Sequence, residues 1–389
     1  MRGLLFIVVL VCGMLVNAQT ALYNNGNLRI HENGNLGFHT NLINEAPFDN
    51  NLGLAGFYSP TALTVSGTVV PLFYDVEIMA ENGLNLSLGV DNANNTTFIV
   101  GDITTPRNQE DIYYNFLDTD GFYLGEGDGA KVDGYAAISN RQNFIFPIGD
   151  ESFLRPLSLS SESNNLFAKC AYFFENPNSP VSLNDNFNTD QLDRDLEMVS
   201  ALEFWRLEST VRCTVNLSWN PRSNISALTD DSTTLVLAGW SKAANHWENL
   251  KASTVIGDLD QGFITSEPFL PSDYEIITIG VTKIPFEPLD REVLNLGNYF
   301  LSPNGDGIND TFFVPELEDS PNNMVRIFDR YGIKVFEKAN YRDEFSGTPN
   351  IDNLVIQKNK GLPAGIYFYT IFMQDLNLDY QGFIYLTNK

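Results

Sequence analysis

Short stretches in which apolar and polar residues alternate run along almost the whole chain, and helical periodicity is nearly absent. Gly, Asn, Asp and Pro separate these stretches, as they do between the strands of all-β proteins. The 28 Phe and 16 Tyr residues favour strands further, because aromatic side chains pack well on a pleated surface. The pattern therefore predicts an all-β protein.

Residues 1–18 are an exception to this pattern. They read MRGLLFIVVLVCGMLVNA, with one positive charge at Arg2, an apolar run and a small residue at Ala18. This is the pattern of a secretory signal peptide that is cleaved before Gln19. An alternative is a lipoprotein acylated at Cys12, but that cleavage usually needs a small residue before the cysteine, and Val11 stands there. We expect the chain to be exported across the inner membrane.

Residues 19–150 consist of short strands with Asn-rich corners. GNLRIH (26–31) recurs as GNLGFH (34–39), and runs such as PLFYDVEIMA (71–80) and TFIVGDI (97–103) follow. Repeated short strands of this kind predict the stacked rungs of a β-helix-like solenoid. An antiparallel sandwich is the alternative.

Residues 151–282 contain longer alternating strands, for example LFAKCAYFF (166–174) and TTLVLAGW (233–240). They predict an immunoglobulin-like β-sandwich, followed by a linker over 283–298 that contains two prolines. All four Trp residues lie here. We expect three of them in the core, namely Trp205, Trp219 and Trp240. Trp247 is the best candidate for exposure.

Residues 299–389 predict a small, compact β-sandwich. MVRIFDRYGIKVFEK (324–338) reads as two strands joined by a tight turn, and GLPAGIYFYTIFM (361–373) and QGFIYLTNK (381–389) read as two more. Between them lie several motifs in a fixed order: PNGDGIND (303–310), IFDRYG (327–332), a loop with Tyr341, LPAGIYFY (362–369) and GFIYL (382–386).

This order of motifs resembles the gliding motility-associated C-terminal domain, the type B sorting domain of the type IX secretion system. The residues that carry the resemblance are Pro303, Asn304, Gly305, Asp306, Gly307, Asn309, Asp310, Arg330, Gly332, Gly347, Gly365 and Tyr367. There is one departure from the family pattern. Before the glycine that corresponds to Gly347, the family commonly has a Trp and then an acidic or amide residue, whereas this chain has Phe345 and Ser346. The aromatic anchor is kept.

The resemblance implies that the folded C-terminal domain is recognised by the type IX translocon and by outer-membrane components. The protein would then be released or held at the cell surface. We expect it to act there by binding or structure, in adhesion or in a gliding-associated role, with surface glycans or surface proteins as partners. Two alternatives are an accessory component docked on the translocon and a secreted carbohydrate-active hydrolase.

The charge of the chain narrows the choice of partners. With 23 Lys and Arg against 49 Asp and Glu, the net charge is −26. Such a field repels phosphate backbones, so we expect no nucleic acid partner. It suits divalent cations, and Asn304, Asp306, Asn309 and Asp310 are spaced as in half of a calcium loop. The alternative is a turn in which these side chains bond their own backbone. Apart from this calcium candidate, no cofactor is predicted.

Cys170 and Cys213 are the candidate disulfide, since export permits one; two buried thiols on adjacent strands are the alternative. The chain has no G-x-S-x-G or H-E-x-x-H motif and no phosphate-binding glycine loop. We therefore name no catalytic residue and expect the protein not to be an enzyme.

Overall fold

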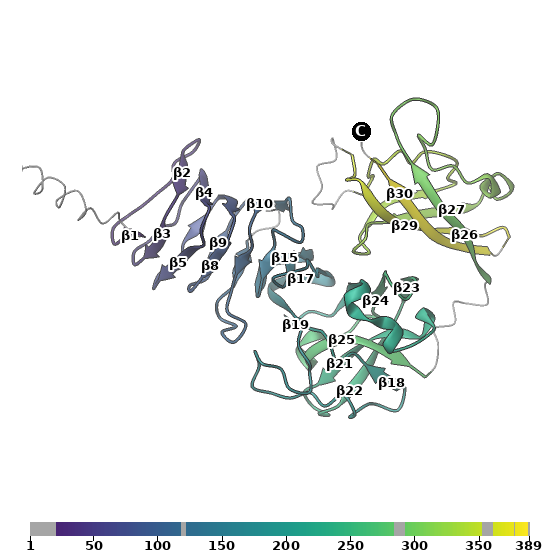
Figure 1. Ribbon diagram of the computed structural model, residues 1–389, viewed down its shortest axis with the longest axis horizontal. Helices are drawn as coiled ribbons and strands as arrows, with labels where there is room; N and C mark the ends of the chain where they lie inside the picture. Colours follow the sequence, from purple (N-terminus) through teal and green to yellow (C-terminus); the bar gives the residue numbers. More distant parts are fainter. Residues whose placement is uncertain (1–20, 118–121, 284–291, 352–360, 377, 388–389) are drawn as a thin grey trace, which may run out of the picture.

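The computed structural model describes residues 21–117, 122–283, 292–351, 361–376 and 378–387. They form an all-β molecule that begins with a solenoid and ends with a separate sheet domain (Figure 1), which confirms the predicted all-β class and the predicted solenoid. The predicted signal peptide lies outside the described residues. Within the described ranges, no helix is both long and apolar enough to cross a membrane.

Parallel strands stack along three faces of the solenoid. The first sheet contains β1 (Ala21–Asn24), β3 (Asn41–Asn44), β5 (Leu63–Gly67), β8 (Leu84–Leu86), β11 (Ile103–Thr104), β14 (Val132–Asp133) and β16 (Ile148–Gly149). The second contains β2 (Asn35–Phe38), β4 (Leu54–Ser59), β7 (Asp75–Ala80), β10 (Asn95–Val100) and β13 (Phe122–Leu124). The third begins with β6 (Leu72–Phe73), β9 (Val90–Asn92) and β12 (Tyr114–Phe116).

Side chains at equivalent positions of successive rungs stack on one another inside the solenoid. The register aligns Phe38 with Phe57 and Phe57 with Ile78, and the rings of Phe38 and Phe57 lie 4.8 Å apart. Equivalent residues such as Asn24 and Asn44 are 20 positions apart. The eight-residue repeat in the sequence therefore lies within the first rung and is not the rung itself.

Buried asparagines hold the corners between rungs. The Asn24 side chain donates to Oδ1 of Asn44 over 2.7 Å, and Asn44 donates to the carbonyl of Val69 over 2.6 Å. Asn51 likewise donates to the carbonyl of Leu72 over 2.7 Å. Each amide satisfies backbone groups that a tight corner removes from the sheet. This explains the Asn-rich punctuation of the sequence.

The third sheet continues into the second region without a break. β12 pairs in parallel with β15 (Ala136–Phe146), and β15 pairs antiparallel with the long β17 (Leu157–Phe173). β17 in turn pairs with β19 (Phe204–Ser209) and β20 (Cys213–Trp219). One hydrophobic cluster runs from Ile30 to Val281. The expected boundary at residue 150 is therefore not a boundary of the core.

The second region consists of mostly antiparallel strands around this shared core. Its remaining strands are β18 (Leu196–Val199), β21 (Leu235–Ser241), β22 (Trp247–Lys251), β23 (Thr254–Gly257), β24 (Gly262–Thr265) and β25 (Tyr274–Thr282). Its short 3-10 helices are Pro221–Ser223, Ile225–Ala227, Ser232–Thr234 and Pro271–Asp273. The immunoglobulin-like arrangement stays a prediction.

Two expectations for this region are corrected. Trp247 is fully buried. Its backbone is hydrogen-bonded to Gln191 and Asp193, so the loop that contains these two residues covers it, and its ring packs 5.7 Å from that of Trp240. Cys170 and Cys213 are free, buried thiols. Cys213 pairs with Ser161, which is nine residues of extended strand away from Cys170, at roughly 3.3 Å per residue. This separation exceeds the reach of a disulfide.

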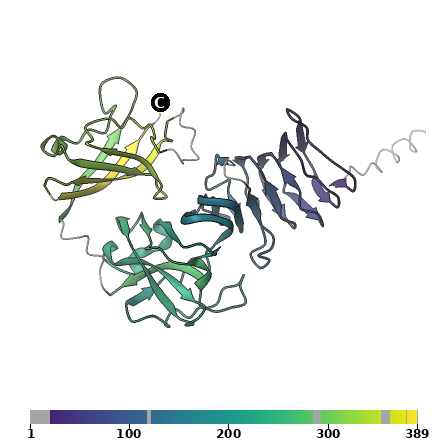
Figure 2. The same cartoon turned by 180° about the vertical axis from the view of Figure 1, so that it is seen from behind.

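The C-terminal domain is a sheet of five strands among the described residues, in the order β26-β30-β29-β27-β28. Its elements are β26 (Glu292–Leu301), β27 (Asn323–Phe328), β28 (Lys334–Ala339), β29 (Gly365–Met373), β30 (Leu378–Leu386) and the 3-10 helix Pro315–Asp319. Residues 292–298, expected in the linker, belong to β26, where they pair with β30. Figure 2 shows from behind that this domain lies beside the second region.

Candidate functional site

The C-terminal domain closes on itself by pairing its first and last strands. β26 runs parallel to β30 from Glu292 to Leu301, and Thr387 donates to the carbonyl of Leu301 over 2.9 Å. A core of its own fills the inner face of the sheet, and it is separate from the core of residues 30–281. The domain therefore has the two features of an autonomous unit, a closed chain path and a private core.

The loop 303–310 is held by its own side chains. Asp310 accepts backbone N–H bonds from Asn304, Gly305 and Gly307 over 2.7 to 2.8 Å. Asp306 accepts from the N–H of Ile308 over 2.8 Å. Both glycines and Asn309 have positive φ.

These bonds explain why Asn, Asp and Gly alternate in this loop: the Asp side chains bond to the backbone of a turn, and the glycines permit its positive φ values. In the described residues no cluster of three or more His, Cys, Asp or Glu could hold a metal. The calcium candidate at Asn304, Asp306, Asn309 and Asp310 stays a prediction.

The tight turn at 329–333 is built around Asp329. Its Oδ1 accepts the N–H groups of Tyr331 and Ile333 over 2.8 and 2.9 Å, and Gly332 donates to its carbonyl over 3.0 Å. Gly332 has φ of +78°, which an L side chain rarely adopts. The guanidinium of Arg330 lies over the ring of Tyr331, 4.6 Å from its centroid.

The loop after β28 is anchored by buried polar bonds. The hydroxyl of Tyr341 donates to the carbonyl of Phe312 over 2.5 Å and accepts the N–H of Phe345 over 3.1 Å. Asn323 exchanges two bonds with the backbone of Tyr341. Phe345 is fully buried, so the residue that replaces the usual Trp does fill the core.

The remaining motif residues gather beside the last strand. Gly347 has φ of +75°, its missing Cβ would lie 3.0 Å from Leu386 and 3.5 Å from Pro303, and its carbonyl accepts the N–H of Leu362. The hydroxyl of Tyr367 donates to the carbonyl of Pro363 over 2.8 Å. The structure thus brings Pro303 and Gly347 together around β30. Arg330 and Gly332 belong to the turn that faces the rest of the chain.

Sequence reasoning missed the contact between this domain and the second region. Phe263 of β24 packs against Phe328 and Phe368, with ring centroids 5.1 and 5.6 Å away. Asn216 donates to the carbonyl of Gly332 over 3.4 Å. The sequence did contain an indication of this contact. In IYFYTIFM (366–373), apolar residues occupy both the odd and the even positions, which indicates a strand that is covered on both faces of the sheet.

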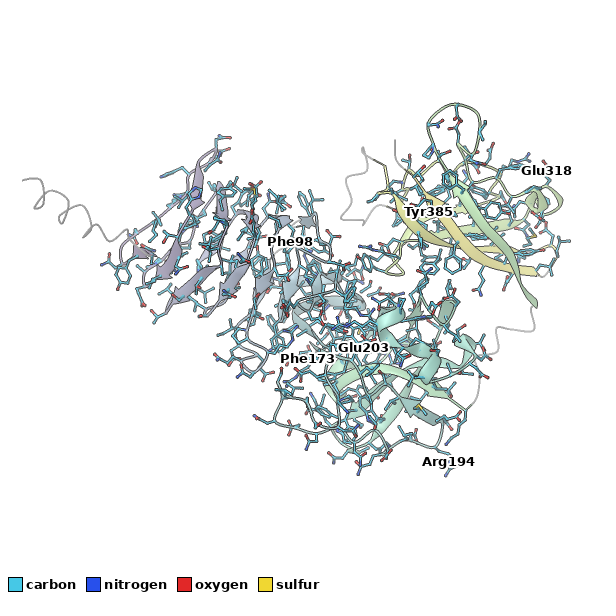
Figure 3. The ribbon with its side chains drawn as sticks, viewed as in Figure 1. Phe98, Phe173, Arg194, Glu203, Glu318 and Tyr385 are labelled. Atoms are coloured by element: carbon cyan, nitrogen blue, oxygen red, sulfur yellow. The ribbon has the colours of Figure 1, made fainter. Side chains whose placement is uncertain are left out.

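A buried ion pair in the second region was also missed. Nη2 of Arg155 lies 2.8 Å from Oε1 of Glu203, and both side chains are at most 2% exposed. Tyr172 donates to Glu203 over 2.7 Å, and Trp205 donates to the carbonyl of Arg155 over 3.1 Å. Glu203, labelled in Figure 3, is thus buried and bonded to both Arg155 and Tyr172, which indicates a structural role for this carboxylate.

The described chain thus has two parts, a long β-structured region (residues 21–283), which we call the passenger, and a C-terminal domain that contains the ordered motifs. Residues 294–386 match the family model described as the CHU_C Type IX secretion signal domain, so this part of the chain is a type IX sorting domain. The passenger lies outside the match. Searches of curated proteins and of solved structures found no match.

Proposed function

We propose that the translocon of the type IX secretion system reads the sorting domain and delivers the passenger to the cell surface. The observation that carries this proposal is the coincidence of the matched segment, 294–386, with a domain that has its own core. A folded sheet with a private core keeps its shape while its cargo varies. Recognition by shape requires such a unit.

At the surface, the passenger acts by binding or structure, in adhesion or in a gliding-associated role. Its continuous core and Asn-bonded corners favour a rigid, extended scaffold over a mobile one. Among the described residues, its two most buried ion pairs also hold the fold together. Lys131, fully buried, is bonded to Asp102 at 2.9 Å, and Arg155 is bonded to Glu203. A non-catalytic role is the simplest use of such a scaffold.

The test compares the full chain with a chain that ends after Pro288, both expressed in a host with type IX secretion. We expect the full chain at the surface or in the medium and the shortened chain in the periplasm. All four Trp residues lie in the passenger, so tryptophan fluorescence checks that the shortened chain is folded. Both chains accumulating outside the cell would refute the sorting role.

A further inference from the structure

One end of the outer face of the sorting-domain sheet is apolar across neighbouring strands. The strand register places Phe328 opposite Phe368 and Phe368 opposite Phe383. Two residues along on the same face, Ile366 is opposite Tyr385, and Tyr385 is opposite Phe300. Because side chains alternate between the faces of a sheet, these residues form one surface, which we call the aromatic face.

Polar residues border the aromatic face. The next cross-strand row on the same side of the sheet holds Arg326, Thr370 and Gln381. Arg326 pairs there with Glu337 of β28 at 2.7 Å. This polar row separates the aromatic face, at the end of the sheet where the 329–333 turn lies, from Met324 and Phe372 in the row beyond it. An apolar patch rimmed by polar residues is typical of a protein interaction site.

The passenger covers half of the aromatic face. Phe263 and Ile256 of the β23–β24 hairpin pack on Phe368, which is 1% exposed, and on Phe328 and Phe383. The ring of Phe368 lies 5.1 Å from that of Phe383. This half therefore already has an occupant, the passenger itself.

The other half of the aromatic face is open. Phe300 and Tyr385 are 51% and 50% exposed, and their rings stack 5.9 Å apart at 19°. Tyr385 is labelled on β30 in Figure 3. Phe300 belongs to β26, which is an edge strand among the described residues. The open half thus combines two stacked aromatic rings with the edge of a sheet, where a partner strand could also add.

We propose that the open half, Ile366, Tyr385 and Phe300, is the surface by which the sorting domain docks on a protein of the type IX secretion apparatus while the passenger hairpin stays in place. The inference rests on the proposed function. Two observations support this docking surface. The open half is continuous with the half that the passenger hairpin covers, and all three of its residues lie in the matched segment. The net charge of −26 argues against an anionic membrane surface as the occupant.

The test is a double variant of the full chain, Phe300→Thr with Tyr385→Thr, expressed in a type IX host. Thr removes the rings and keeps the strand propensity. The matched control is Phe313→Thr with Leu376→Thr, because these residues are 49% and 47% exposed and lie in loops outside the aromatic face. The readout is the fraction of chain that protease reaches on intact cells. The unfolding midpoint of each purified chain checks its fold.

We expect the first double variant to reach the surface about tenfold less than the wild type, since aromatic side chains dominate interface energies. The control pair should be delivered normally. Normal delivery of a folded Phe300→Thr/Tyr385→Thr chain would overturn the inference. If the wild type were then found to be a dimer and this variant a monomer, the open half would be the contact with a second copy of the chain. Delivery of the chain that ends after Pro288 would instead overturn the proposed function itself.

Discussion

Gly332 and Gly305 have the same backbone conformation in different surroundings. Their φ values are +78° and +80°. A Cβ on Gly332 would lie 2.5 Å from Cγ of Phe263 and 2.6 Å from Oδ1 of Asn216, whereas a Cβ on Gly305 would meet nothing within 4 Å. The two glycines therefore separate the cost of backbone strain from the cost of a clash with the passenger.

Gly332→Ala is expected to lower the free energy of unfolding more than Gly305→Ala does. Positive φ at a non-glycine residue costs roughly 1 to 3 kcal/mol in both variants. Only at Gly332 must the docked passenger also move. Chemical denaturation of the two purified variants measures the difference. Equal losses would mean that the turn and the β24 hairpin are not in contact in solution.

Glu203 allows a second prediction at this scale. Glu203→Gln leaves the buried Arg155 guanidinium without a counter-charge, and breaking a buried ion pair costs roughly 3 to 5 kcal/mol. The control is Glu337→Gln, which removes the partner of the exposed Arg326 and is expected to cost about 0 to 1 kcal/mol. The comparison uses the denaturant concentration at the unfolding midpoint of each variant, provided that the dependence of the unfolding free energy on denaturant is the same in both. Similar losses for both variants would contradict a structural role for Glu203.

At the scale of elements, the solenoid loop that carries Glu126 lies near enough to the 329–333 turn of the sorting domain for the charges of Asp329 and Arg330 to act on it. Burial, against a backbone hydrogen bond that lowers it, and the nearby charge of Asp329, against that of Arg330, together raise the pKa of Glu126 to about 7. Burial also outweighs the lowering effect of backbone bonds from Ile333 and Tyr331, so that the pKa of Asp329 is raised to about 6. Two carboxyl groups thus resist ionisation where the two elements meet.

The folded state is expected to lose stability as the pH rises. A carboxyl group whose pKa is raised on folding favours the folded state below its ordinary pKa and loses that contribution as the pH rises through the folded value. Stability should therefore fall between about pH 4 and pH 7, and Glu126→Gln should flatten the change. Unfolding midpoints at several pH values measure it.

Glu337→Gln is the matched control for the pH series. The pKa of Glu337 is lowered by bonds from Lys334 and Arg326, so its removal should leave the change above pH 5 as it is. A wild-type stability that rises over this range would contradict the assignment to Glu126 and Asp329.

At the scale of the whole molecule, the described chain has two principal cores and not three. The solenoid and the second region share one hydrophobic cluster, and the inner face of the sorting domain has another. A third, small cluster joins them where Phe263 meets Phe368. A shared core couples the unfolding of the regions that contribute to it.

Phe57→Ala tests this coupling. Its ring lies inside the solenoid, and its removal is expected to cost roughly 3 to 5 kcal/mol. All four Trp residues lie in the second region, so tryptophan fluorescence reports unfolding away from the mutated site. We expect the fluorescence transition to shift to lower denaturant, while amide exchange in β29 and β30 stays nearly unchanged. An unshifted fluorescence transition would mean that the solenoid unfolds alone.

The sequence by itself determined the all-β class, the solenoid and the sorting domain with its turns. These features depend on patterns that are local in the chain: period-two alternation, Asn and Gly at corners, and ordered motifs such as PNGDGIND. Tertiary structure alone decided that the core continues past residue 150, that Trp247 is buried and that Cys170 and Cys213 lie apart. It also decided that Phe263 covers half of the aromatic face. The physical reason is that alternation shows which side of a strand is apolar, whereas the surface that covers this side is chosen by pairing between distant segments.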